Sequence, residues 1–268
     1  MPSTKEPDHD AHALFLSPAA ADRLMQLIPA IDLRGGRVVR LAQGDYDRET
    51  RYDNDPVALA ATYQEAGADL IHIVDLDSAR HGGDANLATI GRICSELTID
   101  VQTGGGVRSR ADLDARLEAG ALRVVIGSLC VREPDRVAGW LDELGPECIV
   151  AGLDVTPDSD GGWLPKAAGW TESGELELFA LLERLRQAGL RHLLCTDIER
   201  DGMFTGPSVE LYQALVSRFA GLRTQASGGI AAESDLQAAA ATGVAGCIVG
   251  RALLEGRVPM TAIRRWSR

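Results

Sequence analysis

The sequence predicts an α/β fold, a (β/α)8 TIM barrel built from two similar half-barrels. Two observations predict it. From Leu27 onward, eight short apolar runs alternate with helical stretches, and six positions recur at a spacing of 122 or 123 residues. Strands that alternate with helices form a parallel sheet with the helices outside, and eight such units in about 240 residues match a closed barrel.

The apolar runs have the length and composition of buried parallel strands. We expect barrel strands over 27–33, 68–76, 99–105, 122–128, 148–155, 190–198, 222–229 and 245–253, and a small extra strand over 37–43. Helical patterns lie between them, for example over 55–67, 109–120, 175–189 and 231–243. These stretches end in glycine, and Ser109 and Ser234 are predicted N-caps.

Residues 1–24 show no clear period and are predicted to be an N-terminal extension, with the barrel over 25–268. The internal repeat divides the barrel into half-barrels of about 27–148 and 149–260. Three residue pairs are 122 residues apart: Asp32/Asp154, Gly67/Gly189 and Asp75/Asp197. Three more pairs are 123 residues apart: Gly105/Gly228, Asp112/Asp235 and Gly127/Gly250. Two such halves present equivalent groups across the barrel mouth, which suits a long substrate with the same group at each end.

The composition is that of a soluble globular chain: of 268 residues, 45% are hydrophobic and 25% charged. A net charge of −12 argues against nucleic acid and anionic membranes as partners, but a local pocket can still bind a small anion. The five cysteines form no CxxC pair and are expected to be free thiols that pack as small apolar side chains. The sequence lacks both a transmembrane run and a signal-peptide pattern, so a cytoplasmic location is expected.

Glycine-rich segments follow the third, fourth, seventh and eighth predicted strands. The candidate phosphate-binding residues in them are Gly105, Gly106, Gly127, Ser128, Gly228, Gly229 and Gly250. Glycine lets the backbone approach a ligand, and amides at the start of a helix bind anions. Tight βα turns also use glycine, but the symmetric placement favours two phosphate sites. Arg108 and Arg251 are candidate cationic helpers, with a surface charge as the alternative for each.

Asp32 and Asp154 end the first and fifth predicted strands, which lie opposite each other in an eight-stranded barrel. No basic residue stands beside either one in the sequence. One protonated and one ionised carboxyl can move a proton near neutral pH, although each Asp could instead cap a helix or loop. Thr196 and Asp201 follow the sixth strand and could orient a carboxylate or the substrate.

Trp170 follows a polar loop and is predicted to stack on a flat ring of the ligand. His72 and His192 occupy apparently matching places in apolar strands and are predicted to be packing residues, whereas His81 is a candidate ligand contact. The chain contains no HExxH, GxSxG, Walker or GxGxxG motif, so no metal and no cofactor are predicted.

Several segments resemble one known family. They are PAIDLRGGRVVRLAQGDY, IHIVDLDSA, VQTGGGVRS, GLDV, the GW of KAAGWTESG, CTDIERDG, QASGGI and IVGRALLEG, spread over about 27–258. They are similar to the phosphoribosylformimino-aminoimidazole carboxamide ribotide isomerases of histidine biosynthesis. The resemblance implies a (β/α)8 barrel, a substrate with a ribosyl phosphate at each end, and an Amadori rearrangement of an aminoaldose to an aminoketose without metal or cofactor.

The resemblance also implies roles for the acids: Asp32 as the base and Asp154 as the acid, with Asp201 also considered for the acid. This chain departs from the family at Leu129 and Met203, where a small hydroxyl residue is common. Local phosphate contacts are therefore expected to differ from those of the family.

Two other functions stay open at this stage. The sister cyclase barrel of imidazole glycerol phosphate synthase shares the duplication, but its first strand reads Cys-Leu-Asp and a catalytic Lys follows; here the strand reads Ala30-Ile31-Asp32 and Arg37 follows. A non-catalytic barrel that binds a phosphosugar is the other alternative. Action on phosphoribosylanthranilate is a further possibility. The expected partner is a small bisphosphorylated substrate bound to a monomer, with no nucleic acid and no membrane.

Overall fold

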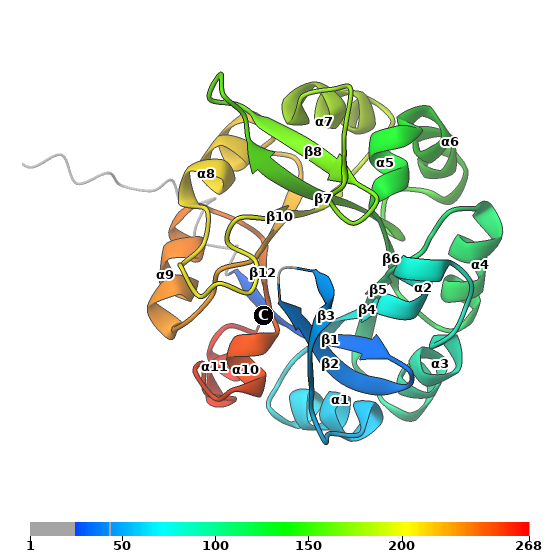
Figure 1. Ribbon diagram of the computed structural model, residues 1–268, viewed down its shortest axis with the longest axis vertical. Coiled ribbons are helices and arrows are strands. Elements are labelled where there is room, and N and C mark those ends of the chain that lie inside the picture. Colours follow the sequence, from blue (N-terminus) through cyan, green and yellow to red (C-terminus); the bar gives the residue numbers. More distant parts are fainter. Residues whose placement is uncertain (1–24, 43, 268) are drawn as a thin grey trace, which may run out of the picture.

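The computed structural model describes residues 25–42 and 44–267 and contains a closed barrel of eight parallel strands with helices outside (Figure 1). Around the barrel the strands are β1 (Gln26–Arg34), β4 (Leu70–Asp75), β5 (Asp100–Gly104), β6 (Arg123–Ile126), β7 (Ile149–Pro157), β10 (His192–Asp197), β11 (Arg223–Ser227) and β12 (Gly246–Val249). Parallel pairing of β7 with β10 and of β12 with β1 closes the ring. The predicted barrel is confirmed, and the extension predicted over 1–24 lies outside the described residues.

The helices follow the strands along the chain. They are α1 (Pro56–Glu65), α2 (Leu76–His81), α3 (Leu87–Glu96), α4 (Arg110–Glu118), α5 (Ser128–Arg132), α6 (Pro134–Leu144), α7 (Leu178–Gln187), α8 (Val209–Arg218), α9 (Glu233–Ala241), α10 (Arg251–Leu254) and α11 (Thr261–Arg265). Ser109 caps α4 in a capping box with Asp112, as predicted. The prediction for Ser234 is wrong: Ala232 is the N-cap of α9, and Ser234 lies inside the helix. There the Asp235 carboxylate accepts the N–H groups of Ala231 and Ala232 and needs no serine cap.

Two of the predicted strands run into a helix. The runs 122–128 and 245–253 were expected to be extended throughout, but α5 begins at Ser128 and α10 at Arg251. Gly127 and Gly250 cause the break, because both have ψ near −100° (−100° and −87°), outside the β region. The glycines therefore turn the chain directly from strand to helix at the barrel rim.

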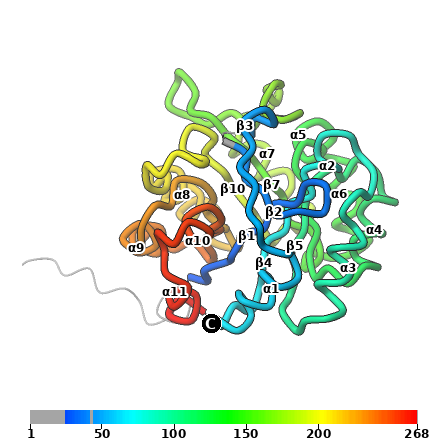
Figure 2. The backbone as a smooth tube through the Cα atoms, turned by 60° about the horizontal axis from the view of Figure 1, so that its bottom comes forward, coloured from blue at the N-terminus to red at the C-terminus, as the bar shows by residue number. Residues whose placement is uncertain are grey.

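Each half carries an antiparallel extension at the C-terminal end of its first strand. β2 (Arg37–Ala42) and β3 (Asp45–Arg51) extend β1, and β8 (Trp163–Ala167) and β9 (Glu172–Ser173) extend β7. β3 reaches well beyond the barrel end (Figure 2). The sequence predicted β2 only, because β3 is polar and largely exposed and β9 has two residues. In both halves the final Asp of the barrel strand, Asp32 or Asp154, pairs with the returning strand.

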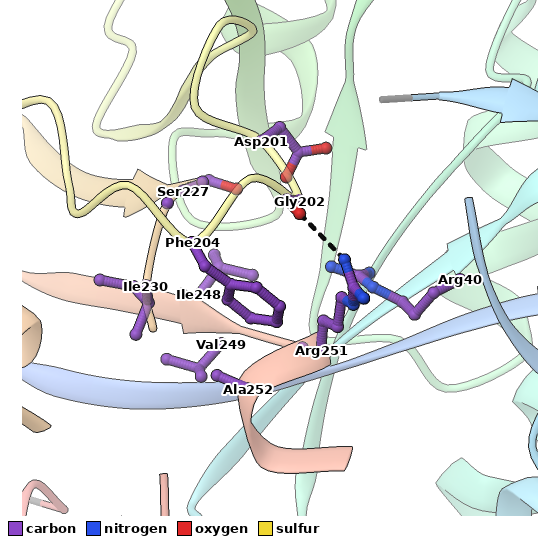
Figure 3. A pocket seen from close by; sticks show the side chains of 13 residues that line it. Arg40, Asp201, Gly202, Phe204, Ser227, Ile230, Ile248, Val249, Arg251 and Ala252 are labelled. Atoms are coloured by element: carbon purple, nitrogen blue, oxygen red, sulfur yellow. Dashed lines mark hydrogen bonds between the residues drawn. The ribbon is translucent and has the colours of Figure 1, made fainter. Parts of the chain in front are cut away.

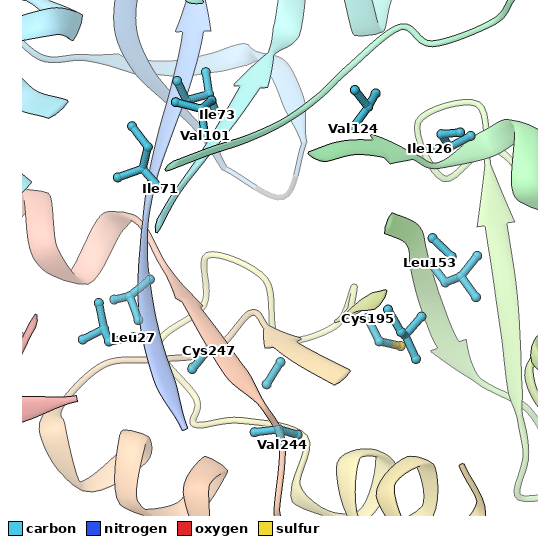
Figure 4. Packing of buried hydrophobic residues seen from close by; sticks show 14 of the residues in the cluster. Leu27, Ile71, Ile73, Val101, Val124, Ile126, Leu153, Cys195, Val244 and Cys247 are labelled. Carbon is cyan, nitrogen blue, oxygen red and sulfur yellow. The ribbon is translucent and has the colours of Figure 1, made fainter. Parts of the chain in front are cut away.

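Strand alternation separates two apolar layers. Outward-facing residues pack against the helices, for example Ile71, Val101 and Leu153 (Figure 4). A second cluster fills the barrel: Ile28, Ala30, Leu70, Val125, Val150, Leu194 and Ile248. Because successive side chains of a strand alternate in direction, the next inward positions after Ala30 and Leu194 are Asp32 and Thr196. Alternation thus carries these polar groups to the mouth.

The five cysteines are free, and three of them, Cys130, Cys195 and Cys247, are buried. Burial raises the pKa of the Cys130 and Cys247 thiols to about 12, so both are protonated at neutral pH and act as apolar side chains. Among the helices that the structure describes, none is long and apolar enough to cross a membrane.

The barrel interior contains a polar link between the two halves. Gln102 on β5 and Gln225 on β11 exchange two hydrogen bonds of 2.8 and 2.9 Å, and Gln102 also contacts the His72 ring at 3.3 Å. The two glutamines are 123 residues apart, as are the other repeat pairs of this part of the chain. Their reciprocal bonding therefore joins equivalent positions of the two halves.

The strand register corrects one detail of the repeat. His72 stands opposite Ala30, and Leu194 stands opposite Gly152, so the counterpart of His72 is Leu194 and not His192. Both histidines are nevertheless buried, as predicted for packing residues. His192 contacts Glu147 at 3.0 Å, on the N-terminal side of the barrel.

The buried histidines predict a loss of stability in acid. Burial lowers the pKa of His72 and of His192 to about 4, so both are neutral in the folded chain at pH 6. An unfolded chain binds these protons near pH 6.5. The contribution of the two neutral histidines to the free energy of unfolding is therefore complete above about pH 6.5. It decreases as the pH falls towards about 4, by up to about 3 kcal/mol for His72. Urea unfolding at pH 7.5 and 4.5 measures it.

The matched variants are His72→Gln and His81→Gln, the second at an exposed histidine. We expect His72→Gln to lose less unfolding free energy between the two pH values than the wild type, and His81→Gln to lose as much as the wild type. Equal losses in all three proteins would contradict the assignment to His72.

Candidate active site

Asp32 is buried at the mouth and carries an ion pair. Its Oδ2 accepts a hydrogen bond of 2.6 Å from Nη1 of Arg40 on β2. The antiparallel register of β1 and β2, in which Asp32 pairs with Val39, brings Arg40 to this place. The expectation that no basic residue stands beside the acids is therefore wrong for Asp32. Arg40 was missed because the hairpin, and not the local sequence, makes the two residues neighbours.

Burial and charge act on Asp32 in opposite directions. Burial raises its pKa, the charge and the hydrogen bond of Arg40 lower it, and the negative charge of Asp201 raises it further. The net pKa lies above the ordinary value for Asp. The main partner of this carboxyl is thus a full positive charge, which favours the ionised form.

Asp154 has neutral partners. Nε1 of Trp170 donates a hydrogen bond of 2.8 Å to its Oδ2, and the register of β7 and β10 sets Thr196 beside it. Burial raises the pKa of Asp154, while hydrogen bonds from Trp170 and Thr196 lower it and the charge of Asp201 raises it. No cation is among these causes. The two repeat-related acids therefore differ in the chemistry of their surroundings.

Asp201 lies in the turn after β10 and acts on both acids. Its charge raises the pKa of Asp32 and of Asp154, and it also stabilises the charged form of Arg40. Three predicted carboxyl groups thus share one mouth. The structure brings together all four residues predicted for catalysis, since Thr196 contributes to the pKa of Asp154.

A pocket lined in part by Asp201 and Arg40 opens at this mouth (Figure 3). It is lined by Arg40, Asp201, Gly202, Phe204, Ser227, Gly228, Gly229, Ile230, Ile248, Val249, Gly250, Arg251 and Ala252. The predicted phosphate residues of the second half, Gly228, Gly229, Gly250 and Arg251, therefore lie together. Arg40 connects this pocket to Asp32: a Cβ at Gly250 would stand 2.7 Å from the Arg40 guanidinium carbon.

Two repeat-related glycines are required by backbone packing. A Cβ at Gly106 would stand 2.2 Å from the carbonyl oxygen of Ser78, and one at Gly229 would stand 2.0 Å from that of Gly206. Both glycines have positive φ, 72° and 84°. These turns need glycine whether or not a ligand binds, so the glycines alone do not indicate a ligand site. The pocket beside Gly228 and Gly229 is the separate observation that indicates one.

The first-half residues have protein partners. Arg108 donates to the carbonyl groups of Ala79 and Arg80 at the end of α2, and Gly105 packs closely on the backbone of Asp75. The Ser128 hydroxyl accepts a hydrogen bond of 3.0 Å from the backbone N–H of Ala168. Gly127 and Ser128 thereby lie beside the loop that carries Trp170.

Trp170 bridges the two halves across the mouth. It lies between β8 and β9, with φ of 73°, next to Ala168 with φ of 53°. Non-glycine residues in this region are strained and often occur at functional sites. Its indole also faces the β2–β3 turn, where a Cβ at Gly44 would stand 3.1 Å from the ring. The ring thus extends from Asp154 to the extension of the other half.

Three other residues singled out in the sequence do not line this pocket. His81 is exposed at the end of α2, Leu129 is buried in the core, and Met203 is 47% exposed on the turn after Asp201. Within residues 25–42 and 44–267, no group of three or more His, Cys, Asp or Glu side chains could hold a metal ion.

Residues 26–259 match the family described as histidine biosynthesis protein. The chain is 50% identical over 232 residues to the 1-(5-phosphoribosyl)-5-((5-phosphoribosylamino)methylideneamino)imidazole-4-carboxamide isomerase of Stenotrophomonas maltophilia, covering 87% of this chain and 95% of that protein. Proteins of the same name from Xanthomonas oryzae pv. oryzae and Xanthomonas campestris pv. campestris are 50% and 49% identical, with the same coverage. The matched region contains the whole barrel.

Proposed function

The chain belongs to the histidine biosynthesis protein family, and we infer from this that it is an aldose–ketose isomerase of histidine biosynthesis. It catalyses an Amadori rearrangement of the compound in its relatives' name, which carries two phosphoribosyl groups. The sister cyclase is not favoured, because these relatives are named as isomerases.

The partners of the two acids support opposite roles for them. Asp32 faces the Arg40 guanidinium, whose charge favours the carboxylate, the form of a general base. Asp154 is buried among neutral donors, so its protonated form is less disfavoured, as a general acid requires. We assign Asp201 an electrostatic role, because its charge raises the pKa of Asp154 and helps that group to keep its proton.

The reaction then follows as a series of proton transfers. Asp154 gives its proton to the ring oxygen of the aminoaldose ribose, the C1–O bond breaks, and the nitrogen lone pair forms an iminium. Asp32 takes the proton from C2, and the electron pair of that bond forms the enolamine. Return of a proton to C1 and loss of the hydroxyl proton from C2 give the aminoketose, and both carboxyl groups regain their starting states.

The repeat suits the two ends of the substrate. Backbone amides around Gly228, Gly229 and Gly250 would bind one phosphate in the observed pocket, and Gly105, Gly106, Gly127 and Ser128 would bind the other. Trp170, next to Asp154, would stack on the imidazole. We further propose that the chain acts as a monomer in the cytoplasm and binds neither nucleic acid nor membrane.

The main observation in support of this function is that the two repeat-related acids have different partners. Asp32 accepts a hydrogen bond from a cation, and Asp154 accepts hydrogen bonds from neutral donors. The test is turnover of the aminoaldose by the purified chain without ammonia. We expect formation of the aminoketose and complementation of a histidine auxotroph that lacks the isomerase. Ammonia-dependent turnover of the aminoketose, with no turnover of the aminoaldose, would indicate the cyclase, and binding of the aminoaldose with no turnover of either compound would indicate a sensor. A parallel assay with phosphoribosylanthranilate decides whether a second substrate is used.

A further inference from the structure

One aromatic ring in the wall of the pocket contacts two arginines. Phe204 lies in the turn between β10 and α8 and lines the pocket beside Gly202 (Figure 3). The guanidinium carbon of Arg251 is 4.6 Å from the centre of the ring, and that of Arg257 is 4.2 Å from it. Both lie within the range of a cation–π contact.

The polar groups of the two arginines are engaged by the protein. Arg251 donates from Nε to Glu255 at 2.6 Å and from Nη1 to the carbonyl of Gly202 at 3.1 Å. Glu255 also pairs with Arg257, at 3.6 Å. Arg251 is thus directed to the turn and to Phe204, although the sequence suggested it as a phosphate helper.

The turn needs such support because its backbone is strained. Phe204 has φ of 57°, a left-handed conformation that non-glycine residues rarely adopt. Asp201 is held separately, since its N–H bonds to the carbonyl of Asp197 at 3.1 Å. Loss of the ring contacts should therefore loosen the pocket wall at Gly202 and Phe204 more than it displaces Asp201.

We propose that Arg251 and Arg257 are positioning residues that hold Phe204, and through it the wall of the second phosphate pocket. Arg257 is the informative member, because it does not line the pocket and its side chain is 51% exposed. The proposal rests on the isomerase function. It adds which residues fix the backbone around one of the two phosphate sites.

The test is a double-mutant cycle on the full chain with the bisphosphorylated aminoaldose as substrate. We expect Arg257→Ala to raise KM about five- to tenfold, the size of one or two cation–π contacts, with kcat within about twofold of the wild type. Phe204→Leu should raise KM at least as much. The double variant should equal Phe204→Leu, because both changes remove the same contact. Arg257→Lys, which keeps a cation over the ring, should recover most of the affinity.

Arg218→Ala is the matched control, since Arg218 stacks on Phe179 and Phe219 in another part of the barrel. It should leave KM unchanged. A KM of Arg257→Ala within twofold of the wild type, or effects that multiply in the double variant, would overturn the proposal. In either case a wild type that turns over normally leaves the isomerase function intact, whereas an inactive wild type refutes that function itself.

Discussion

Asp32→Asn and Asp154→Asn are each expected to lower kcat by about a thousandfold or more, while KM changes by less than about tenfold, because general acid or base catalysis contributes about 10² to 10⁴ at each step. Asn has the shape of Asp but can neither accept the C2 proton nor donate one to the ring oxygen. The phosphate sites are untouched by either change, so the substrate should still bind. Steady-state kinetics on the purified chain measures both quantities.

The control is Asp114→Asn, at a partly exposed aspartate of α4 that pairs with Arg110. It should retain wild-type kinetics, and thermal unfolding should show that all three variants are folded. Near-normal turnover by Asp32→Asn or Asp154→Asn would show that the role assigned to that residue is wrong. If Asp154→Asn alone stays active, Asp201 becomes the candidate acid.

The second large effect is expected at Arg40. Arg40→Met removes the group that opposes the rise in the pKa of Asp32 caused by burial. The pKa of Asp32 should therefore rise further, and the base should stay protonated to a higher pH. We expect the acidic limb of the kcat/KM profile to move to higher pH, and kcat/KM at pH 7 to fall by about a hundredfold, because removal of one partner of a buried ion pair costs about 3 kcal/mol or more. Part of the loss should come from the pocket, which Arg40 also lines.

Arg40→Lys should shift the acidic limb less than Arg40→Met, because it keeps the charge. Arg37→Met, at an exposed arginine of the same strand β2, is the matched control and should leave the profile unchanged. An acidic limb of Arg40→Met at the wild-type position would contradict the ion pair as the cause of the state of Asp32.

Several features followed from sequence alone because they depend on local patterns. Apolar runs of strand length between helical stretches specify a barrel, and the 122–123-residue repeat pairs Asp32 with Asp154 and Gly105 with Gly228. The errors were also local. Ser234 suggested a cap where Asp235 does the capping. Similar places in apolar strands suggested that His192 matches His72, although the strand register places Leu194 there.

What distinguishes the two acids was decided by the tertiary structure. Arg40 reaches Asp32 because β2 folds back along β1, Trp170 reaches Asp154 from a loop after β8, and Asp201 acts on both from the turn after β10. The contacts of Phe204 with Arg251 and Arg257 likewise join two distant segments of the chain. Periodicity determines which residues face inward along one strand. Which inward groups meet depends on the register between strands and on where loops return, and no local pattern in the sequence specifies these.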